Sequence, residues 1–449
     1  MLDKIKKTIE LIKSVDFDAL QKLNEKVDLK KLMESVGSLN DDQLKGIVHL
    51  LNNANKKHEV PPIDADFYDI GDKLSADDRA LQLKVRAFME KEIAPIVNEY
   101  WLHDEFPKEI IPKLAELNIA GLSFDGYGCA GKSSLLEGII ACELARVDAS
   151  IATFFGVQGV LCMGSIYTCG SEEQKQKWLP PLQQFQKIGA FGLTEPEVGS
   201  GAAGGLTTTC EKTENGWVLN GQKKWIGNAT FADIVVIWAS DVADNQVKGF
   251  IVETTTEGFS VEKIKDKMAL RIVQNGLITM KNCIVQEDNR LPNANSFKDT
   301  AKVLQATRAG VAWMAVGCAR GAYENALAYT TQREQFGKPI AAFQLIQNHL
   351  VEMLSNLTAM QTMVFRLSEL QDEGKLKDEH ASLAKVFCTL RTRDIVSRAR
   401  EVMGGNGILL EYNVARFLAD AEAIYSYEGT KEINSLIVGR SITGFSAFV

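Results

Sequence analysis

One carboxylate near the C-terminus is the strongest candidate for chemistry in this 449-residue chain. Glu428 lies in "IYSYEGTKEIN" (424–434), between an aromatic stretch and a Gly-Thr pair. Two interpretations are open at this point. An acid at a helix start is commonly a solvated residue that interacts with the positive end of the helix dipole. The same acid beside Ile424, Tyr425 and Tyr427 could instead be a general base, because low polarity raises the pKa of a carboxylate.

The other reactive side chains form no metal-binding or disulfide pattern. The eight cysteines include no C-x-x-C pair, and the five histidines show no ligand spacing. We therefore expect free thiols and no metal site. The net charge of −8, without a dense basic block, argues against nucleic acid as a main partner. The cysteines are Cys129, Cys142, Cys162, Cys169, Cys210, Cys283, Cys318 and Cys388.

A glycine-rich segment matches the dinucleotide-binding consensus but lacks its structural context. "GYGCAG" (126–131) has the form G-x-G-x-x-G, precedes a predicted helix, and is followed by Asp148 about 20 residues on. A dinucleotide fold also needs a buried parallel strand on each side of that helix. The flanking segments are poor strands and no βαβ alternation follows. We interpret these glycines as a tight loop between helices.

The hydrophobic pattern divides the chain into a helical, a β-rich and a second helical part, behind an N-terminal extension. The extension predicts short amphipathic helices that end at a proline-containing linker. Short β-rich runs such as "GWVLNGQKKWIGN" and "ADIVVIWAS" then separate two stretches of helical periodicity. The last part predicts helices over 300–331, 342–372, 377–403 and 429–440. The predicted boundaries are 1–60, 61–189, 190–297 and 298–449.

One uncharged stretch is long enough to span a bilayer, residues 149–170. Ser, Thr, Gln and Gly are frequent in it, and neither an aromatic belt nor a basic flank frames it. These features favour a helix buried within a large core. The N-terminus resembles neither a secretory signal nor a transit peptide, and the C-terminus is no peroxisomal signal. We expect a cytoplasmic protein.

Five segments in a fixed order resemble the motifs of the acyl-CoA dehydrogenase and oxidase superfamily. The resemblance is nearest to glutaryl-CoA dehydrogenases and short-chain acyl-CoA oxidases, and it runs from about residue 62 to the C-terminus. It implies an α+β fold with an N-terminal helical domain, a middle β-barrel-like domain and a C-terminal four-helix bundle. The segments are "FGLTEPEVGSG" (191–201), "KKWIGNATFAD" (223–233), "TQREQFGKPIAAFQLIQ" (331–347), "EVMGGNGILLEYNVARFLAD" (401–420) and "YEGTKEIN" (427–434).

The resemblance implies bound FAD and α,β-dehydrogenation of a CoA thioester. In the family a carboxylate removes the pro-R α-proton while the β-hydride passes to flavin N5. Such a base must be dry and well positioned, and the developing enolate oxygen needs donors, which in the family are the backbone N–H of the catalytic Glu and a flavin ribityl hydroxyl. The family's alternative base position, beside Arg308, holds Thr307 here, so Glu428 is the expected base.

The same resemblance implies two sets of cofactor contacts. Taken alone, "LTEPEVGS" would be a plain turn, Trp225 a core residue and Arg333 a surface charge. In the family the first set lies at the flavin and corresponds to Leu193, Thr194, Ser200, Trp225, Ile226 and Gly227. Thr430 and Glu432, which follow the expected base, should also touch FAD. The second set contacts the pyrophosphate and adenosine of a neighbouring subunit's FAD and corresponds to Arg333, Gln344, Glu401, Gly404 and Gly405. Substrate contacts are expected at Ser200, Arg308 and Gly429.

Departures from the family pattern bear on the substrate and on the electron acceptor. Gly201 stands where the family usually has Asp, and Ala152 and Gly156 replace the Arg and Ser that glutaryl-CoA dehydrogenases use for the distal carboxylate. Gly227 replaces the Thr that most dehydrogenases place at flavin N5, and the short-chain oxidases resemble this chain in "WIGN".

From the resemblance we expect a short-chain acyl-CoA dehydrogenase, with a short-chain acyl-CoA oxidase that forms hydrogen peroxide as the alternative. The acceptor is then an electron-transfer flavoprotein or oxygen, and the shared FAD implies a homotetramer or a homodimer. A flavin-binding structural protein or a nucleic-acid-associated relative is a further alternative. The intact "YEGT" and the acidic net charge count against it.

Overall fold

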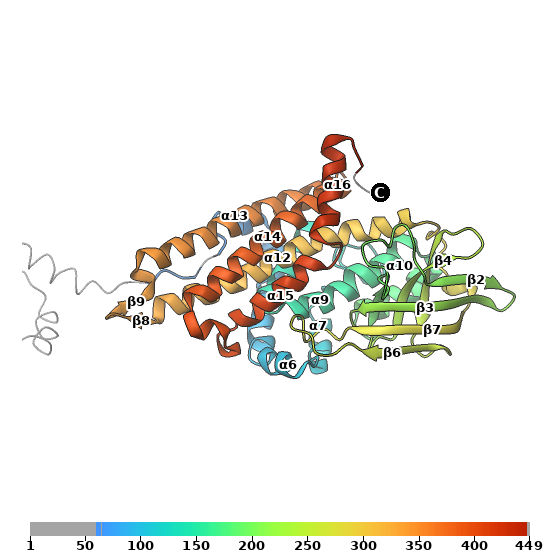
Figure 1. Ribbon diagram of the computed structural model, residues 1–449, viewed down its shortest axis with the longest axis horizontal. Coiled ribbons are helices and arrows are strands. Elements are labelled where there is room, and N and C mark those ends of the chain that lie inside the picture. Colours follow the sequence, from blue (N-terminus) through green and yellow to red (C-terminus); the bar gives the residue numbers. More distant parts are fainter. Residues whose placement is uncertain (1–59, 64, 447–449) are drawn as a thin grey trace, which may run out of the picture. The chain divides into compact units, whose positions relative to one another are not determined.

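The computed structural model describes residues 60–63 and 65–446 (Figure 1). The chain divides after Pro62, and the elements that follow all belong to the unit that begins at Ile63. The helices predicted for residues 1–60 lie outside the described residues. From Ile63 onward, the predicted order of a helical part, a β part and a second helical part is confirmed.

The first part is a set of helices whose starts are specified locally. At α5, α8, α9 and α11 a Ser or Asp side chain accepts a hydrogen bond from a backbone N–H of the first turn. Loop residues connect α7 to α8, so the glycine-rich segment 126–131 is an inter-helix loop, as predicted. The helices are α5 (Ala76–Phe88), α6 (Val97–His103), α7 (Ile111–Ala115), α8 (Ser134–Val147), α9 (Ala149–Gly156), α10 (Met163–Cys169) and α11 (Glu172–Gln183), with short helical turns η1 (Ile70–Lys73), η2 (Met89–Ile93), η3 (Lys108–Ile110) and η4 (Val157–Cys162).

The uncharged stretch forms a continuous helical segment inside the protein. Helix α9, the π-helical turn η4 and α10 together cover Ala149–Cys169, 21 residues with a mean hydropathy of 1.5. By length and composition this segment could cross a membrane, but 83% of it is buried against the rest of the protein. The prediction of a core helix is therefore confirmed.

The middle part is a curled seven-stranded sheet with the order β1-β4-β2-β3-β7-β6, in which β5 pairs with β4. Asn215 lies in the tight turn between β2 and β3, and Gly216 pairs with Thr213. The sequence prediction missed β1 and β2, which are short and lack a clear alternation. The strands are β1 (Gly189–Gly192), β2 (Thr209–Thr213), β3 (Gly216–Ile226), β4 (Ile234–Asp241), β5 (Val247–Glu253), β6 (Phe259–Lys263) and β7 (Gly276–Val285), with a turn η5 (Glu287–Asn289) after the last.

The last part is a bundle of long helices packed closely on the first part. Gly317 and Gly321 of α12 meet the backbone of α8, where a Cβ would lie 2.4 Å from the carbonyl oxygen of Cys142 and 2.1 Å from that of Arg146. The prediction missed α15 and the hairpin of β8 and β9. The elements are α12 (Phe297–Gln332), β8 (Glu334–Gln335), β9 (Lys338–Pro339), η6 (Ile340–Ala342), α13 (Gln344–Asp372), α14 (Asp378–Val402), η7 (Gly404–Ile408), η8 (Leu410–Tyr412), α15 (Val414–Ser426) and α16 (Lys431–Thr443).

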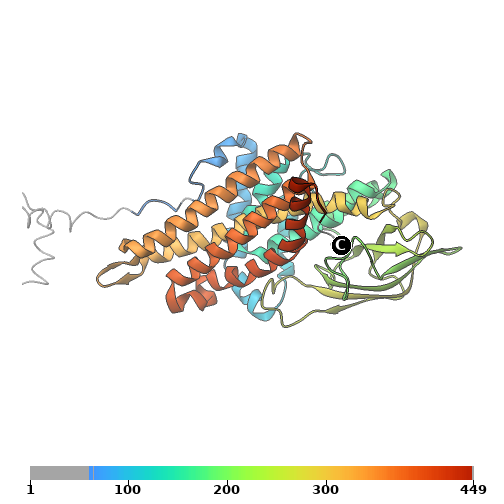
Figure 2. The same cartoon turned by 45° about the horizontal axis from the view of Figure 1, so that its top comes forward.

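The sheet and the β8–β9 hairpin lie at opposite ends of the helical bundle. In both views α12, α13 and α14 run side by side, with the sheet beyond one end and the hairpin at the other (Figures 1 and 2). Helix α12 is the element that connects these two ends, because it begins after the sheet and ends at Gln332, just before β8.

Candidate active site

Glu428 lies in the short turn between α15 and α16 and is half-buried. Its φ is +53° and that of Gly429 is +82°, so two consecutive residues have the left-handed backbone conformation. Such a conformation is unfavourable for a residue with a Cβ and persists only where the surroundings enforce it. Thr430 then caps α16, because its hydroxyl accepts a hydrogen bond from the N–H of Ile433 at 3.3 Å. The turn therefore fixes the direction in which Glu428 points.

A hydroxyl on the facing helix α12 meets the carboxylate of Glu428. Thr307 Oγ1 lies 2.8 Å from Glu428 Oε2 and 2.9 Å from the carbonyl oxygen of Leu304, and Thr307 is buried. A hydroxyl has one proton, so it donates to the carboxylate when Glu428 is ionised. When Glu428 is protonated, the acid can donate to Thr307 while the hydroxyl proton turns to Leu304. Both protonation states of Glu428 thus have a hydrogen-bond partner.

Arg308, the next residue on α12, is directed to the start of α14. Its guanidinium forms an ion pair with the carboxylate of Asp378, and the Arg308 side chain is 11% exposed. Arg308, the cation predicted to bind the substrate, therefore lies beside Thr307. Its Nε is buried and is a donor without a partner among the described residues.

A buried ion pair holds the segment that follows β1 against β3. Lys223 Nζ donates to Glu195 Oε1 at 2.8 Å and to the carbonyl of Leu193 at 3.0 Å, and both charged side chains are fully buried. The backbone N–H of Lys224 donates to the carbonyl of Thr194 at 2.8 Å. These contacts bring two segments predicted to contact the flavin ring together: 193–194 and 225–227.

The charges of this pair are set by opposing effects. Burial favours the neutral form of Glu195, but Lys223, Thr207 and Thr208 outweigh it and lower the pKa of Glu195 to about 2. Burial lowers the pKa of Lys223 to about 8, and the attraction of Glu195 offsets this effect only partly. Both groups are thus ionised at neutral pH. Sequence reasoning missed the pair, although "LTEP" and "KKWIGN" contain both residues.

The end of β3 turns sharply beside η4. Trp225 has a φ of +67° and the residue is 53% exposed, whereas Ile226 and Gly227 are buried. A Cβ on Gly227 would lie 3.1 Å from Val157 Cγ2. Asn228 donates from Nδ2 to the carbonyl of Phe154 at 3.3 Å. The large side chain of Trp225 is therefore exposed to solvent on a fixed backbone, close to Gly227, which has no side chain.

Helix α9 connects the β3 turn with the Glu428 turn. The β3 turn contacts α9 through Asn228, whose Nδ2 donates to the carbonyl of Phe154. Helix α15, which leads to Glu428, is fixed to α9 by a buried ion pair between Arg416 Nη1 and Asp148 Oδ2 at 2.6 Å. The two predicted parts of the active site thus adjoin one element.

The remaining predicted residues occupy two different places. Ser200 is exposed on the loop after β1, and Glu432 is exposed in the first turn of α16. The second cofactor set lies around the distal end of the bundle: His349 Nε2 of α13 is 3.9 Å from Glu401 Oε1 of α14, and Asn406 of η7 donates to the hydroxyl of Tyr329 of α12. That set is Arg333, Gln344, Glu401, Gly404 and Gly405, all exposed.

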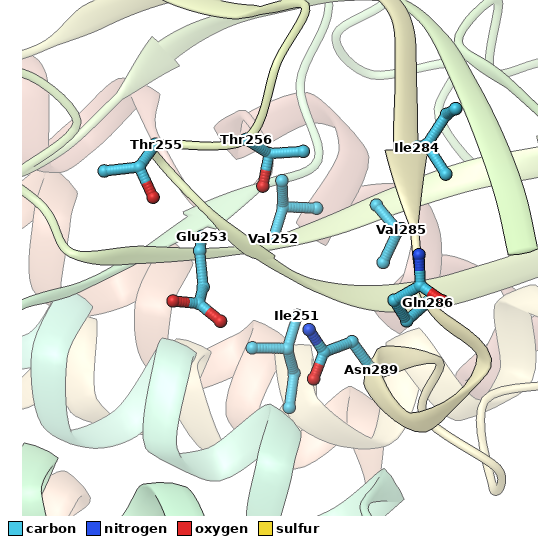
Figure 3. Close-up of a pocket in the computed structure, with 9 residues that line it drawn as sticks. All are labelled: Ile251, Val252, Glu253, Thr255, Thr256, Ile284, Val285, Gln286 and Asn289. Carbon is cyan, nitrogen blue, oxygen red and sulfur yellow. The ribbon is translucent and has the colours of Figure 1, made fainter.

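The structure also has a pocket unrelated to these residues. A hollow of about 260 Å³ lies between β5, the end of β7 and η5, and Glu253, Thr256 and Asn289 are among its lining residues (Figure 3). None of the residues predicted to bind flavin or substrate lines it. Among the described residues, no group of His, Cys, Asp and Glu side chains could hold a metal ion, and the eight cysteines are free thiols.

Comparison with known proteins identifies the family. The chain matches the acyl-CoA dehydrogenase N-terminal domain over residues 75–186, the middle domain over 190–283 and the C-terminal domain over 297–443. It is 34% identical to a short-chain-specific acyl-CoA dehydrogenase of Megasphaera elsdenii, covering 79% of this chain and 95% of that protein. It is 33% identical to the CarC subunit of the caffeyl-CoA reductase–Etf complex of Acetobacterium woodii, covering 81% and 97%.

A solved structure agrees with this result. The glutaryl-CoA dehydrogenase of Mycobacterium smegmatis in complex with FADH2 superposes with a TM-score of 0.83 at 35% identity, covering 85% of this chain and 98% of that one. With the three domain matches, this establishes the fold and the cofactor. The chain belongs to the acyl-CoA dehydrogenase family of FAD-dependent oxidoreductases that act on CH–CH groups.

Proposed function

We propose that this chain dehydrogenates short-chain acyl-CoA thioesters to trans-2-enoyl-CoA, with Glu428 as the base. The observation that carries the proposal is the position of Glu428: a carboxylate in a left-handed turn, half-buried, with one oxygen 2.8 Å from the hydroxyl of Thr307. A solvated helix-start acid would need neither the unfavourable φ nor a buried partner on another helix. We infer that the turn serves to aim the carboxylate.

The residues of this chain fit the family's FAD. The exposed ring of Trp225 and the half-buried Thr194 offer an aromatic face and a hydroxyl at one place. Gly404 and Gly405 have open space where a Cβ would lie, and no carboxylate pairs with Arg333 within residues 65–446. The bound cofactor supplies the chemistry of hydride acceptance from the substrate's β-carbon.

The distance between the two cofactor sets supports a shared cofactor. Thr307 contacts Glu428, and Arg333 follows 26 residues later along the same helix, which is about 39 Å at 1.5 Å per residue. The two places are therefore far apart within a single subunit. We therefore propose a homodimer or homotetramer in which Arg333 of one subunit binds the pyrophosphate of the FAD of its neighbour.

The chain's own groups then have defined roles. Glu428 takes the α-proton. As its carboxylate becomes neutral, the hydroxyl of Thr307 changes from donor to acceptor in the hydrogen bond with Glu428. Backbone N–H groups at the turn are available to the thioester oxygen, which gains negative charge as the proton leaves. The neighbouring Arg308, with one free donor, is the candidate contact for the CoA part of the substrate.

The acyl pocket favours an uncharged short chain over a dicarboxylic one. Ala152 and Gly156 lie on α9, a helix without any charged side chain, and Ala152 is 2% exposed. A second carboxylate in such surroundings would have no cation to offset its loss of hydration. Butyryl-CoA is therefore the expected substrate in preference to glutaryl-CoA.

One observation favours an oxidase as the second candidate. Gly227 has no side chain at the turn beside the proposed flavin position, so no hydroxyl or methyl fills the space at that point. Oxygen could then reach the reduced cofactor. The dehydrogenase remains our first choice, with an electron-transfer flavoprotein as acceptor. The relative CarC supports this choice, because it is a subunit of a caffeyl-CoA reductase–Etf complex.

The test is anaerobic mixing of the purified flavoprotein with butyryl-CoA. We expect the flavin absorbance to be bleached, and Glu428→Gln to retain FAD and bind butyryl-CoA but to bleach several orders of magnitude more slowly. Glu422→Gln is the matched control, because Glu422 pairs with Arg393 on the outside of α15. Bleaching by Glu428→Gln within tenfold of the wild-type rate would contradict the role of Glu428. An equal or higher kcat/KM for glutaryl-CoA would contradict the substrate.

A further inference from the structure

A buried lysine lies directly beneath the turn that carries Glu428. Lys385 is in the second turn of α14, a helix that packs against α12, α15 and α16, and it is 0% exposed. Its ammonium donates to the carbonyl of Gly429 and lies 3.4 Å from that of Tyr425. A buried lysine usually pairs with a carboxylate. Here the partners within hydrogen-bond distance are backbone carbonyls on either side of Glu428.

The contact with Gly429 restrains the unusual part of the backbone. The carbonyl of Gly429 accepts from Lys385 and also from Asn434 Nδ2 at 2.8 Å, and Asn434 is fully buried. Two donors on one carbonyl fix the plane of the peptide that follows Gly429. Because Glu428 and Gly429 both have positive φ, rotation of that peptide would redirect the side chain of Glu428.

Three charged groups face the ammonium of Lys385. Burial lowers the pKa of Lys385 to about 8, whereas Glu428 and Glu432 raise it and Arg308 lowers it further. The ammonium is therefore protonated at neutral pH.

We propose that Lys385 is a positioning residue for the Glu428 base: its ammonium holds the carbonyl of Gly429, so that the turn aims the carboxylate. The inference rests on the proposed function of Glu428. Lys385 does not take the α-proton itself, because its ammonium is directed at the inner side of the turn, toward the carbonyls.

A purely structural role predicts a different outcome. If Lys385 only filled the interior, an uncharged side chain of similar length would be tolerated or would stabilise the fold, since burying an ammonium is unfavourable. Neither the turnover number nor its pH dependence would then change. The two roles are distinguished by the chemistry of the proton-transfer step and by its pH profile.

The experiment compares the flavin-loaded wild type with Lys385→Gln and Lys385→Met. Gln retains a donor without charge, and Met retains neither. Thr389→Val is the matched control: Thr389 is buried one turn further along α14, and its hydroxyl bonds only within that helix. For each protein, kcat and KM for butyryl-CoA, exchange of the α-proton with deuterated solvent, and the pH profile of kcat/KM are measured, with FAD content and thermal unfolding as checks on the fold.

We expect kcat and α-proton exchange to fall about tenfold in Lys385→Gln and further in Lys385→Met, with KM within about threefold of wild type. In the wild type kcat/KM should fall as pH rises through about 8, where the ammonium deprotonates, and this alkaline limb should be absent from the variants. Thr389→Val should match the wild type.

Folded, flavin-loaded Lys385→Gln with wild-type kcat and wild-type exchange of the α-proton would overturn the inference. If neither variant folds, the wild type decides, because a kcat/KM that stays level from neutrality to about pH 10 with the flavin retained leaves no role for the ammonium. The proposed function fails separately: a wild type that neither bleaches with butyryl-CoA nor exchanges the α-proton overturns both, whereas an active wild type with unaffected variants overturns the role of Lys385 alone.

Discussion

Replacing Lys223 by Met should destabilise the fold and loosen the loop that is predicted to contact the flavin. The ammonium is fully buried and bonds Glu195 and the carbonyl of Leu193. Without it the carboxylate of Glu195 is a buried charge that only the donors of Thr207 and Thr208 compensate. Breaking a buried pair from one side costs about 3 to 5 kcal/mol, and we expect the lower figure because these donors remain.

The pKa values of Glu195 and Lys223 correspond to free energies of the same size, and they lead to a stricter test. The pKa of Glu195 is lowered from 4.5 to about 2, which corresponds to about 3 kcal/mol of stabilisation by the ionised form. The pKa of Lys223 is lowered from 10.5 to about 8, a cost of about the same size. Near pH 7 the two contributions nearly cancel. The double variant Lys223→Met/Glu195→Gln should therefore recover most of the lost stability, since Gln still accepts from Thr207 and Thr208.

Urea unfolding of the wild type, the two single variants and the double variant measures these free energies. The contribution of Glu195 is fully present above pH 4.5 and is lost as pH falls toward 2, so the wild type should lose about 3 kcal/mol more than the double variant over that range. FAD retention should remain weak in the double variant, because nothing then holds the carbonyl of Leu193. A Lys223→Met protein as stable as wild type, or a double variant that retains FAD normally, would refute this reasoning.

Three further variants test other contacts. Thr307→Val should lower kcat for butyryl-CoA roughly tenfold to hundredfold, because a hydrogen bond to a charged group contributes about 1.5 to 3 kcal/mol; an unchanged kcat would show that the hydroxyl does not act on Glu428. Gly227→Thr should slow reoxidation of the substrate-reduced flavin by oxygen, although Val157 must shift by a few tenths of an ångström to admit the new Cβ. Stopped-flow traces identical to wild type would remove the main support for an oxidase. Arg333→Ala should increase the rate of FAD loss and weaken the oligomer by removing a charge-assisted phosphate contact, whereas Arg366→Ala, on the exposed side of α13, should do neither. Equal FAD retention in the two variants would contradict the shared cofactor.

The sequence by itself determined the order of the elements and singled out Glu428 as the proposed base. Helices and strands leave periods of 3.6 and 2 residues in the hydrophobic pattern, and long elements such as α12, α13, α14 and β3 could be predicted from it. Short elements carry too few periods for this. That is why the prediction missed β1, β2, the β8–β9 hairpin and α15, which follows a glycine-rich break.

The ordered motifs were also readable from the sequence, because each retains the residue types that flavin and thioester chemistry require. Glu428 was singled out by its place in "YEGT", and the resemblance supplied its partners Leu193, Thr194 and Trp225. The fold that the resemblance implied is confirmed by the domain matches over residues 75–443. The individual contacts of these residues with cofactor and substrate stay predictions.

Only the tertiary structure decided how the base is held. The hydrogen bond between Thr307 and Glu428 joins residues 121 positions apart, and the buried pair of Lys223 and Glu195 joins residues 28 apart. In a sequence, Lys385 predicts a solvated side chain, since a lysine is almost never fully buried without a partner. Whether such a group is buried depends on which helices pack over it, and that depends on the burial of apolar surface along the whole chain. The polar contacts that aim Glu428 are therefore a consequence of long-range packing, which local patterns do not encode.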